Sequence, residues 1–113
     1  MNTQTITIDE YENDGSFINL YYNELIGEWC AYGFSAYGLW LYCQSNGYDT
    51  LQSFSQRIQM PCLVTARDTF MRLLQNTADI TEQTDSHVRI RMQEKIPMDA
   101  YREWTRTQRS ENS

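Results

Sequence analysis

The most regular pattern of hydrophobic and polar positions lies in residues 87–93, where apolar and polar side chains alternate. Alternation with a period of two is typical of a strand with one buried and one solvent-facing side. Residues 16–22 are rich in β-branched and aromatic side chains without helical spacing, which predicts a second strand, covered on both faces. The polar face of the strand in residues 87–93 is expected to carry Arg89 and Arg91.

Three stretches have the spacing of an amphipathic helix. The first is expected to start at Ser35 as its N-cap and to stop at Gly47. The second starts near Thr65, with an acidic residue three positions later, and the third follows Pro97, a residue that suits the first turn of a helix. Met98, Tyr101 and Trp104 form the narrow apolar stripe of this third helix.

A further strand is expected in residues 27–32. One or two more are expected in residues 48–64, with an irregular stretch at Pro61. The fold class is therefore α/β (α+β), a mixed β-sheet flanked by about three helices. We expect one domain in residues 16–109 and a loose tail in residues 110–113. Residues 1–15 are interpreted as an N-terminal strand around Ile6 and Ile8, or as an acidic extension.

Length and charge narrow the function classes. A chain of 113 residues fits one domain and is too short for most multidomain enzymes. The net charge of −6 conceals an asymmetry, because residues 1–56 contain seven acidic residues and no Lys or Arg, while residues 57–113 contain all nine basic residues. This segregation is compatible with a phosphate-binding surface, with a docking face for a charged partner, or with merely solvated charges.

The reactive residue types do not suggest an active site. The three cysteines lack the paired spacing of a metal site and lie among apolar neighbours, so reduced, buried thiols in a cytoplasmic protein are expected. His87 is the single histidine and is interpreted as the exposed first residue of a strand. Residues 10–15 imitate the first half of a calcium loop, but Tyr21 replaces its final carboxylate. We expect no catalytic residue, metal or cofactor, and no segment is apolar enough to enter a membrane.

Several residues in order resemble the N-terminal mismatch-recognition domain of MutS. In that family a strand leads into a Gly-Asp-Phe-Tyr-Glu turn, and here a predicted strand leads into Gly27-Glu28-Trp29-Cys30-Ala31. Farther on, Ile58-Gln59-Met60 is similar to the family's Ile-Pro-Met, and residues 88–93 are similar to its Val-x-Ile-x-x-Gln strand. The resemblance spans about residues 17–93. It implies a fold like MutS domain I, with Trp29 at the place of the stacking Phe and Ala31 at the place of the Glu.

The resemblance is to small free-standing MutS-like proteins that accompany the reverse transcriptases of diversity-generating retroelements. It implies a noncatalytic accessory protein that acts beside nucleic-acid machinery. Its partners would be nucleic acid (DNA or RNA) and a larger protein such as a polymerase or reverse transcriptase, and a homodimer stays open. The candidate nucleic-acid-binding residues are Trp29, Arg89, Arg91, Arg102 and Arg106. The alternative is a protein–protein interaction module or adaptor that uses its aromatic, acidic N-terminal half.

Overall fold

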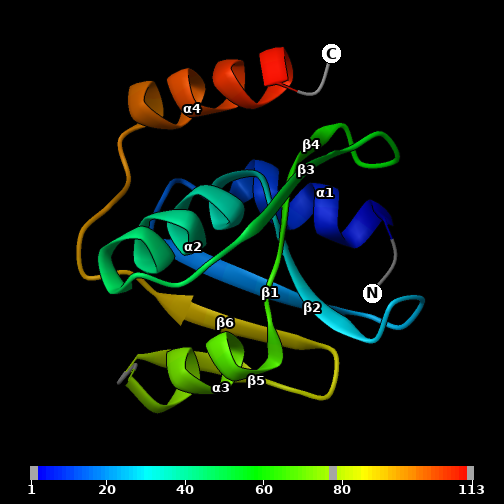
Figure 1. The fold of residues 1–113 in the computed structure, drawn as a ribbon, viewed down its shortest axis with the longest axis vertical. Helices are drawn as coiled ribbons and strands as arrows, with labels where there is room; N and C mark the ends of the chain where they lie inside the picture. Colours follow the sequence, from blue (N-terminus) through cyan, green and yellow to red (C-terminus); the bar gives the residue numbers. More distant parts are fainter. Residues whose placement is uncertain (1–2, 77–78, 112–113) are drawn as a thin grey trace.

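All the strands of the chain that are described join one sheet, and helices pack on both of its faces (Figure 1). The structure is a computed structural model and describes residues 3–76 and 79–111. Within these residues the elements are α1 (Thr3–Glu12), β1 (Phe17–Asn23), β2 (Glu28–Tyr32), α2 (Gly33–Asn46), β3 (Leu51–Ser55), β4 (Met60–Val64), α3 (Arg67–Asn76), β5 (Ile80–Gln83), β6 (His87–Arg91) and α4 (Met98–Glu111).

The strand order in the sheet is β3-β4-β2-β1-β6-β5, and every pairing is antiparallel. The α+β class is therefore confirmed. Two details differ from the expected arrangement, since the sheet contains no parallel pair among its described strands and four helices are described instead of about three. Because β1 pairs with both β2 and β6, it joins the two halves of the sheet.

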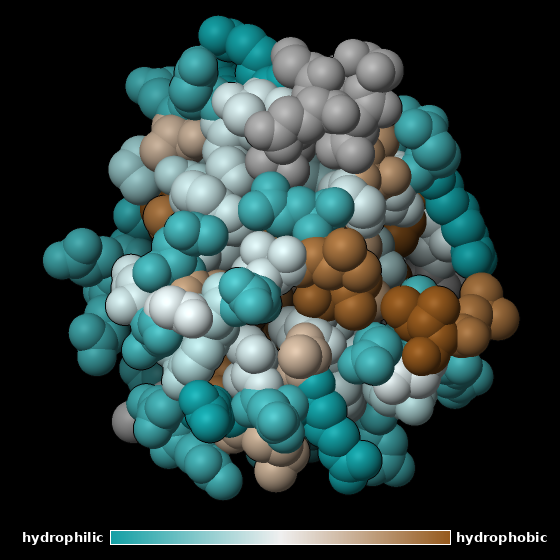
Figure 2. All heavy atoms as spheres, in the orientation of Figure 1, coloured by the Kyte–Doolittle hydropathy of each residue, from teal (hydrophilic) through white to brown (hydrophobic). Residues whose placement is uncertain are grey.

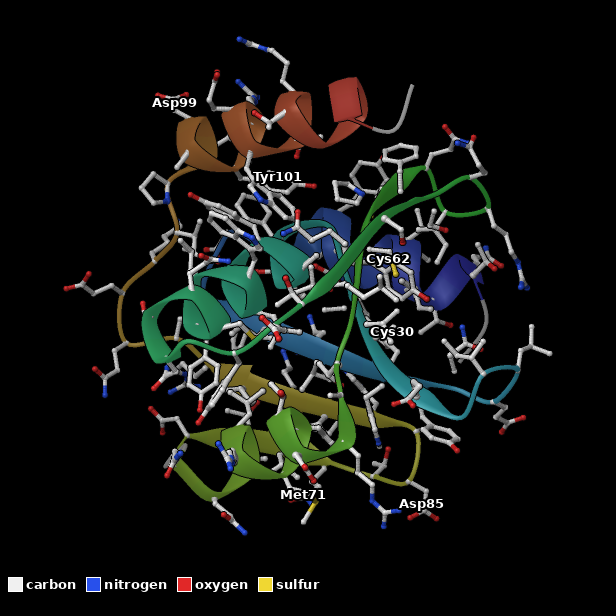
Figure 3. The ribbon with its side chains drawn as sticks, viewed as in Figure 1. Cys30, Cys62, Met71, Asp85, Asp99 and Tyr101 are labelled. Carbon is white, nitrogen blue, oxygen red and sulfur yellow. The ribbon has the colours of Figure 1, made fainter. Side chains whose placement is uncertain are left out.

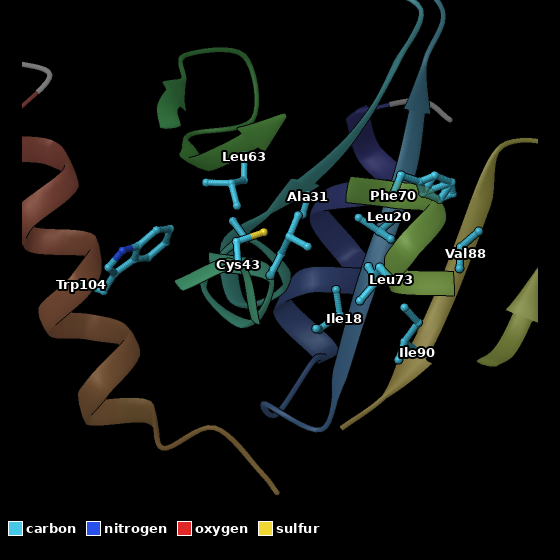
Figure 4. Close-up of a cluster of buried hydrophobic side chains, with 12 residues drawn as sticks. Ile18, Leu20, Ala31, Cys43, Leu63, Phe70, Leu73, Val88, Ile90 and Trp104 are labelled. Carbon is cyan, nitrogen blue, oxygen red and sulfur yellow. The ribbon is translucent and has the colours of Figure 1, made fainter. Parts of the chain in front are cut away.

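The larger core lies between the sheet and helices α2 and α3, with one tryptophan contributed by α4 (Figure 4). Alternate residues of the strands supply it, as the period of two requires. Its most deeply buried members include Leu20 of β1, Ala31 of β2 and Leu39 of α2. The predicted alternation of the last strand is confirmed, because Val88 and Ile90 are buried in this core.

A smaller core occupies the opposite face of the sheet, beneath α1. Ile6 is the member that α1 supplies, and the strands β1, β2 and β4 supply the remaining residues, namely Tyr21, Cys30, Tyr32, Met60 and Cys62. The two cores lie on opposite sides of the same strands. Successive residues along β1 or β2 therefore point to opposite faces and belong to different cores.

The N-terminal interpretation was wrong. Residues 3–12 form helix α1 instead of a strand or an extension, and α1 packs on the sheet through Ile6 and Glu10. These residues are four positions apart and so lie on one helical face. Because one of the two buried positions is a carboxylate, the sequence lacks the apolar spacing that predicts a helix.

Two other boundaries also differ. Helix α4 extends to Glu111, beyond the expected start of a loose tail at Ser110, and residues 112–113 lie outside the described residues. Helix α2 begins at Gly33, before the expected cap Ser35, but it ends as predicted, with Gly47 in the left-handed conformation. The edge strand β5 was not predicted, since Ile80 is its one residue that packs on the core.

Candidate interaction surface

The turn between β1 and β2 has a defined shape. The carbonyl oxygen of Asn23 accepts hydrogen bonds from the backbone N–H groups of Ile26 (3.3 Å) and Gly27 (2.8 Å). The Asn23 side chain accepts a further one from the N–H of Leu25 at 3.0 Å. Gly27 has a φ of 67°, a left-handed conformation that glycine adopts without steric cost. These contacts hold the turn in one conformation without help from a partner.

This turn presents two large aliphatic side chains to solvent. The exposed fraction is 84% for Leu25 and 54% for Ile26. Figure 2 shows hydrophobic residues gathered at the right edge of the molecule, where Figure 1 places the β1–β2 turn, and Leu25 and Ile26 are the exposed large hydrophobic residues of that turn. Adjacent exposed aliphatic residues on an ordered turn are a common feature of surfaces that bind another protein.

A cavity of about 340 Å³ lies beside the turn. Its walls come from the N-terminal end of α1, the β1–β2 turn and the β3–β4 turn, and they include Thr3, Ile6, Tyr21, Tyr22, Asn23, Glu24, Leu25, Tyr32, Ser55, Arg57 and Ile58. Leu25 thus belongs both to the projection and to the rim of the cavity. We call the exposed Leu25 and Ile26 together with this cavity the turn surface.

A buried polar network fixes α1 against the sheet beneath this surface. The Glu10 carboxylate accepts hydrogen bonds from Tyr21 Oη at 2.9 Å, from Asn19 Nδ2 at 3.1 Å, and from both the backbone N–H (3.1 Å) and the hydroxyl (2.8 Å) of Ser35. Glu10 therefore caps the N-terminus of α2 from another helix. Burial raises the pKa of Glu10, and the donated hydrogen bonds only partly offset that effect.

His87 extends the network toward solvent and corrects one prediction. It is the first residue of β6, as predicted, but it is buried instead of exposed. Its Nε2 lies 2.9 Å from Asn19 Oδ1, its Nδ1 lies 3.4 Å from Glu82, and its ring stacks on Tyr21. Burial lowers the pKa of His87 and outweighs the opposing effect of Glu82 and Asp9. Glu10 and Ser35 are buried, so the hydrogen bonds between them serve to position α1 against α2.

Trp29 is half-buried and packs against the larger core. Its ring stacks on Phe70 of α3 with a centroid distance of 4.6 Å, and Tyr22 lies against it at 5.5 Å. Other aromatic residues that were candidates for a surface patch are also engaged, since Tyr32 is buried and Tyr37 packs on Trp104. The contact with Phe70 occupies one face of the Trp29 ring.

The structure separates the four candidate arginines into two pairs. Arg89 and Arg91 project from the face of β6 opposite to Val88 and Ile90, which is the α1 side of the sheet. Arg102 and Arg106 lie on α4, which packs through Trp104 on the other side. Arg106 also forms an exposed ion pair with Glu103 at 3.1 Å. The four arginines therefore do not form one continuous surface.

The Arg89 and Arg91 pair does share an aromatic neighbour that the sequence analysis did not identify. The Arg89 guanidinium lies over the Phe17 ring, 3.9 Å from its centroid, and that of Arg91 lies at 6.0 Å. Phe17 reaches them because it pairs with Arg91 across the β1–β6 ladder. Among the described residues, the buried Nε of Arg89 has no hydrogen-bond partner.

Within residues 3–76 and 79–111, no three His, Cys, Asp or Glu side chains lie together as a potential metal site. A second cavity of about 530 Å³ lies between α2 and residues 91–97, with Gly38, Tyr42 and Ile96 among its lining residues.

Comparisons with known proteins add no assignment. No family model, curated protein or solved structure significantly matches the chain. Among the described residues, no helix combines the length and the apolar character that would be needed to cross a lipid bilayer.

Sequence reasoning missed the turn surface for an identifiable reason. Leu25 and Ile26 lie between two predicted strands, where polar turn residues are the rule, and two adjacent aliphatic residues at that place were the available signal. The neighbouring cavity had no such signal. Its walls come from segments more than fifty residues apart in sequence, such as Thr3 and Arg57.

Proposed function

We propose that the protein is a noncatalytic accessory that docks on a larger protein through the turn surface. The observation that carries the proposal is the exposure of Leu25 and Ile26 on a turn whose backbone is already held in place. A preorganised apolar anchor binds with a small loss of conformational entropy. A polymerase or reverse transcriptase is the partner class that the resemblance to MutS domain I implies, and a cytoplasmic location suits the three free thiols.

The charge around the turn defines the partner further. Glu24 adjoins Leu25, and residues 1–56 contain no Lys or Arg. Arg57, which lines the cavity, adds a basic group to the turn surface. The complementary surface is therefore an apolar pocket for Leu25 and Ile26, with a basic group facing Glu24 and an acidic group facing Arg57.

Replacing Leu25 and Ile26 together by Asp is expected to abolish docking, because two charges would enter an apolar pocket. The tagged full chain would be purified from its native host, and the bound proteins compared by quantitative mass spectrometry. The partner so identified would then be titrated with the purified variants. We expect its affinity to fall at least about tenfold.

Met71→Asp is the matched control, because Met71 is also an exposed aliphatic residue, at 48%, but lies on α3. It should bind the partner like the unchanged chain, and circular dichroism should show that all three proteins are folded. A partner that binds the double variant as tightly as the unchanged chain would contradict the proposal, as would equal loss with Met71→Asp.

A second candidate function is direct contact with nucleic-acid phosphates through Arg89 and Arg91. The observation in its favour is their position around Phe17, together with the unpaired Nε of Arg89 among the described residues. Arginine beside an aromatic ring is a common arrangement at single-stranded nucleic-acid sites.

The double change Arg89→Gln and Arg91→Gln is expected to remove this binding. Fluorescence anisotropy with single-stranded and duplex oligonucleotides at low salt would measure it. Two phosphate contacts on a single strand predict a slope of about −1.4 for log affinity against log salt. The control, Arg102→Gln with Arg106→Gln, should leave binding unchanged. Absence of binding by the unchanged chain, or equal loss in both variants, would reject this function.

A further inference from the structure

Two of the three cysteines lie side by side on neighbouring strands. In the β2–β4 ladder Cys30 is opposite Val64, and Tyr32 is opposite Cys62. Cys30 and Cys62 are therefore diagonal neighbours on the same face of the sheet, and they belong to the same core beneath α1 (Figure 3). Both are buried and neither is bonded to another cysteine.

The two thiols interact directly. The Cys62 thiol donates its hydrogen to the sulfur of Cys30, which holds the pKa of Cys30 below its ordinary value. The same contact, followed by burial, raises the pKa of Cys62, since a second negative charge beside the first is unfavourable. One sulfur of the pair is thus prepared to act as a nucleophile while the other retains its proton.

Cys43 provides an internal contrast. It lies on α2 in the core on the other side of the sheet, and burial alone raises its pKa. Cys43 therefore serves as an internal control, because it shows whether a reagent reacts with the adjacent pair in preference to an isolated buried thiol.

The core that contains the pair borders a cavity, although neither cysteine is among the residues that line it. The cavity of about 340 Å³ at the turn surface is lined by Ile6, Tyr21 and Tyr32, which are members of the core that contains both cysteines. A molecule the size of hydrogen peroxide fits in this space.

We propose that Cys30 and Cys62 are a redox modification site, which a hydroperoxide converts to a reversible disulfide between β2 and β4. The Cys30 thiolate attacks one oxygen of hydrogen peroxide and the O–O bond breaks. This gives a sulfenic acid on Cys30 and a hydroxide that takes the proton of Cys62 to form water. The Cys62 sulfur then attacks the Cys30 sulfur, the S–O bond breaks, and the departing oxygen leaves as a second water after taking up the proton initially lost from Cys30. Two thiols are oxidised and one peroxide is reduced to two waters.

Strand geometry explains why the bond is reversible. Diagonal neighbours in an antiparallel ladder have Cα atoms about 7–8 Å apart. Most disulfides span about 4.4–6.8 Å, so closure requires the two Cα atoms to approach by roughly 1 Å, which a small slide of β4 along β2 can provide. A disulfide closed against such resistance is reduced more easily than a relaxed structural one.

The location gives the modification a structural consequence. Three residue pairs join β4 to β2, and through β4 they connect the β3–β4 hairpin to the rest of the sheet. A covalent bond at this ladder fixes the hairpin, including Arg57 and Ile58 at the wall of the cavity.

The test uses the full chain, reduced and folded, exposed to a small excess of hydrogen peroxide, then quenched and alkylated. Intact-mass measurement before alkylation should show the loss of two hydrogen atoms, and proteolytic mapping after alkylation should find Cys30 linked to Cys62 with Cys43 alkylated. Glutathione should restore all three thiols. Cys43→Ser should behave like the unchanged chain, whereas Cys30→Ser and Cys62→Ser should form no intramolecular disulfide.

Mapping of the unchanged chain decides the result even if a variant fails to fold. Stable oxygen addition without a disulfide, a disulfide that includes Cys43, a link between two chains, or no reaction would overturn the proposal. A Cys30–Cys62 disulfide that glutathione does not reduce would overturn its reversibility.

Discussion

Replacing Glu10 by Ala is expected to lower the free energy of unfolding by about 3 kcal/mol or more, because several buried donor groups lose their acceptor. The backbone N–H of Ser35, the Asn19 amide and the Tyr21 hydroxyl all donate to the Glu10 carboxylate. Urea denaturation followed by circular dichroism would measure the loss. Small domains have about 5–15 kcal/mol in total, so the loss is a large fraction of the stability.

Glu12→Ala is the matched control, since Glu12 is an exposed acid on the same helix. Its effect should stay within about 0.5 kcal/mol. Similar losses in both variants would show that general helix propensity, rather than the buried network, explains the result.

The effect of Glu10 should also depend on pH in a definite direction. Because the folded state raises the pKa of Glu10 above 4.5, the folded chain binds this proton more tightly than the unfolded chain. The stabilisation linked to that proton is fully present below pH 4.5 and is lost as the pH rises through the folded-state pKa. The difference in stability between the unchanged chain and Glu10→Ala should therefore widen as the pH falls from neutral toward 4.5.

Trp104→Ala is expected to cost about 3–5 kcal/mol, the usual range for removing a buried tryptophan. Trp104 is 7% exposed and packs its ring against Tyr37 at 5.2 Å and Trp40 at 6.0 Å. These contacts attach α4 to α2. The loss should be measured by urea denaturation, with hydrogen exchange showing whether α4 loses protection before the rest of the chain.

Tyr11→Ala serves as the comparison for Trp104→Ala, because Tyr11 is an aromatic residue on a helix but is 80% exposed. It should change the stability by no more than about 0.5 kcal/mol. A small effect of Trp104→Ala would mean that α4 is not held by its aromatic contacts.

The sequence predicted those elements in which apolar spacing and packing agree. The alternation at Val88 and Ile90 identified β6 and its buried face, and Gly47 identified the end of α2. Prediction failed where a polar side chain occupies a buried position. Glu10 and His87 are buried because partners distant in sequence satisfy them, and local patterns contain no information about such partners.

The candidate sites were less predictable than the fold. The grouping of Arg89, Arg91 and Phe17 depends on the β1–β6 register, and the proximity of Cys30 to Cys62 depends on the β2–β4 register. Neither register follows from the composition of a single strand. The resemblance to MutS domain I stays a prediction, because it concerns residue order and not these pairings.

The pairing of β1 with β6 also constrains when the protein can fold. Leu20 of β1 has Val88 of β6 as its partner, so this ladder joins distant parts of the chain. During synthesis β1 can form its hairpin with β2 early, but one edge of β1 stays unpaired until residues 87–91 have left the ribosome. A nascent chain stalled before β6 would expose that edge, and with it a site for self-association.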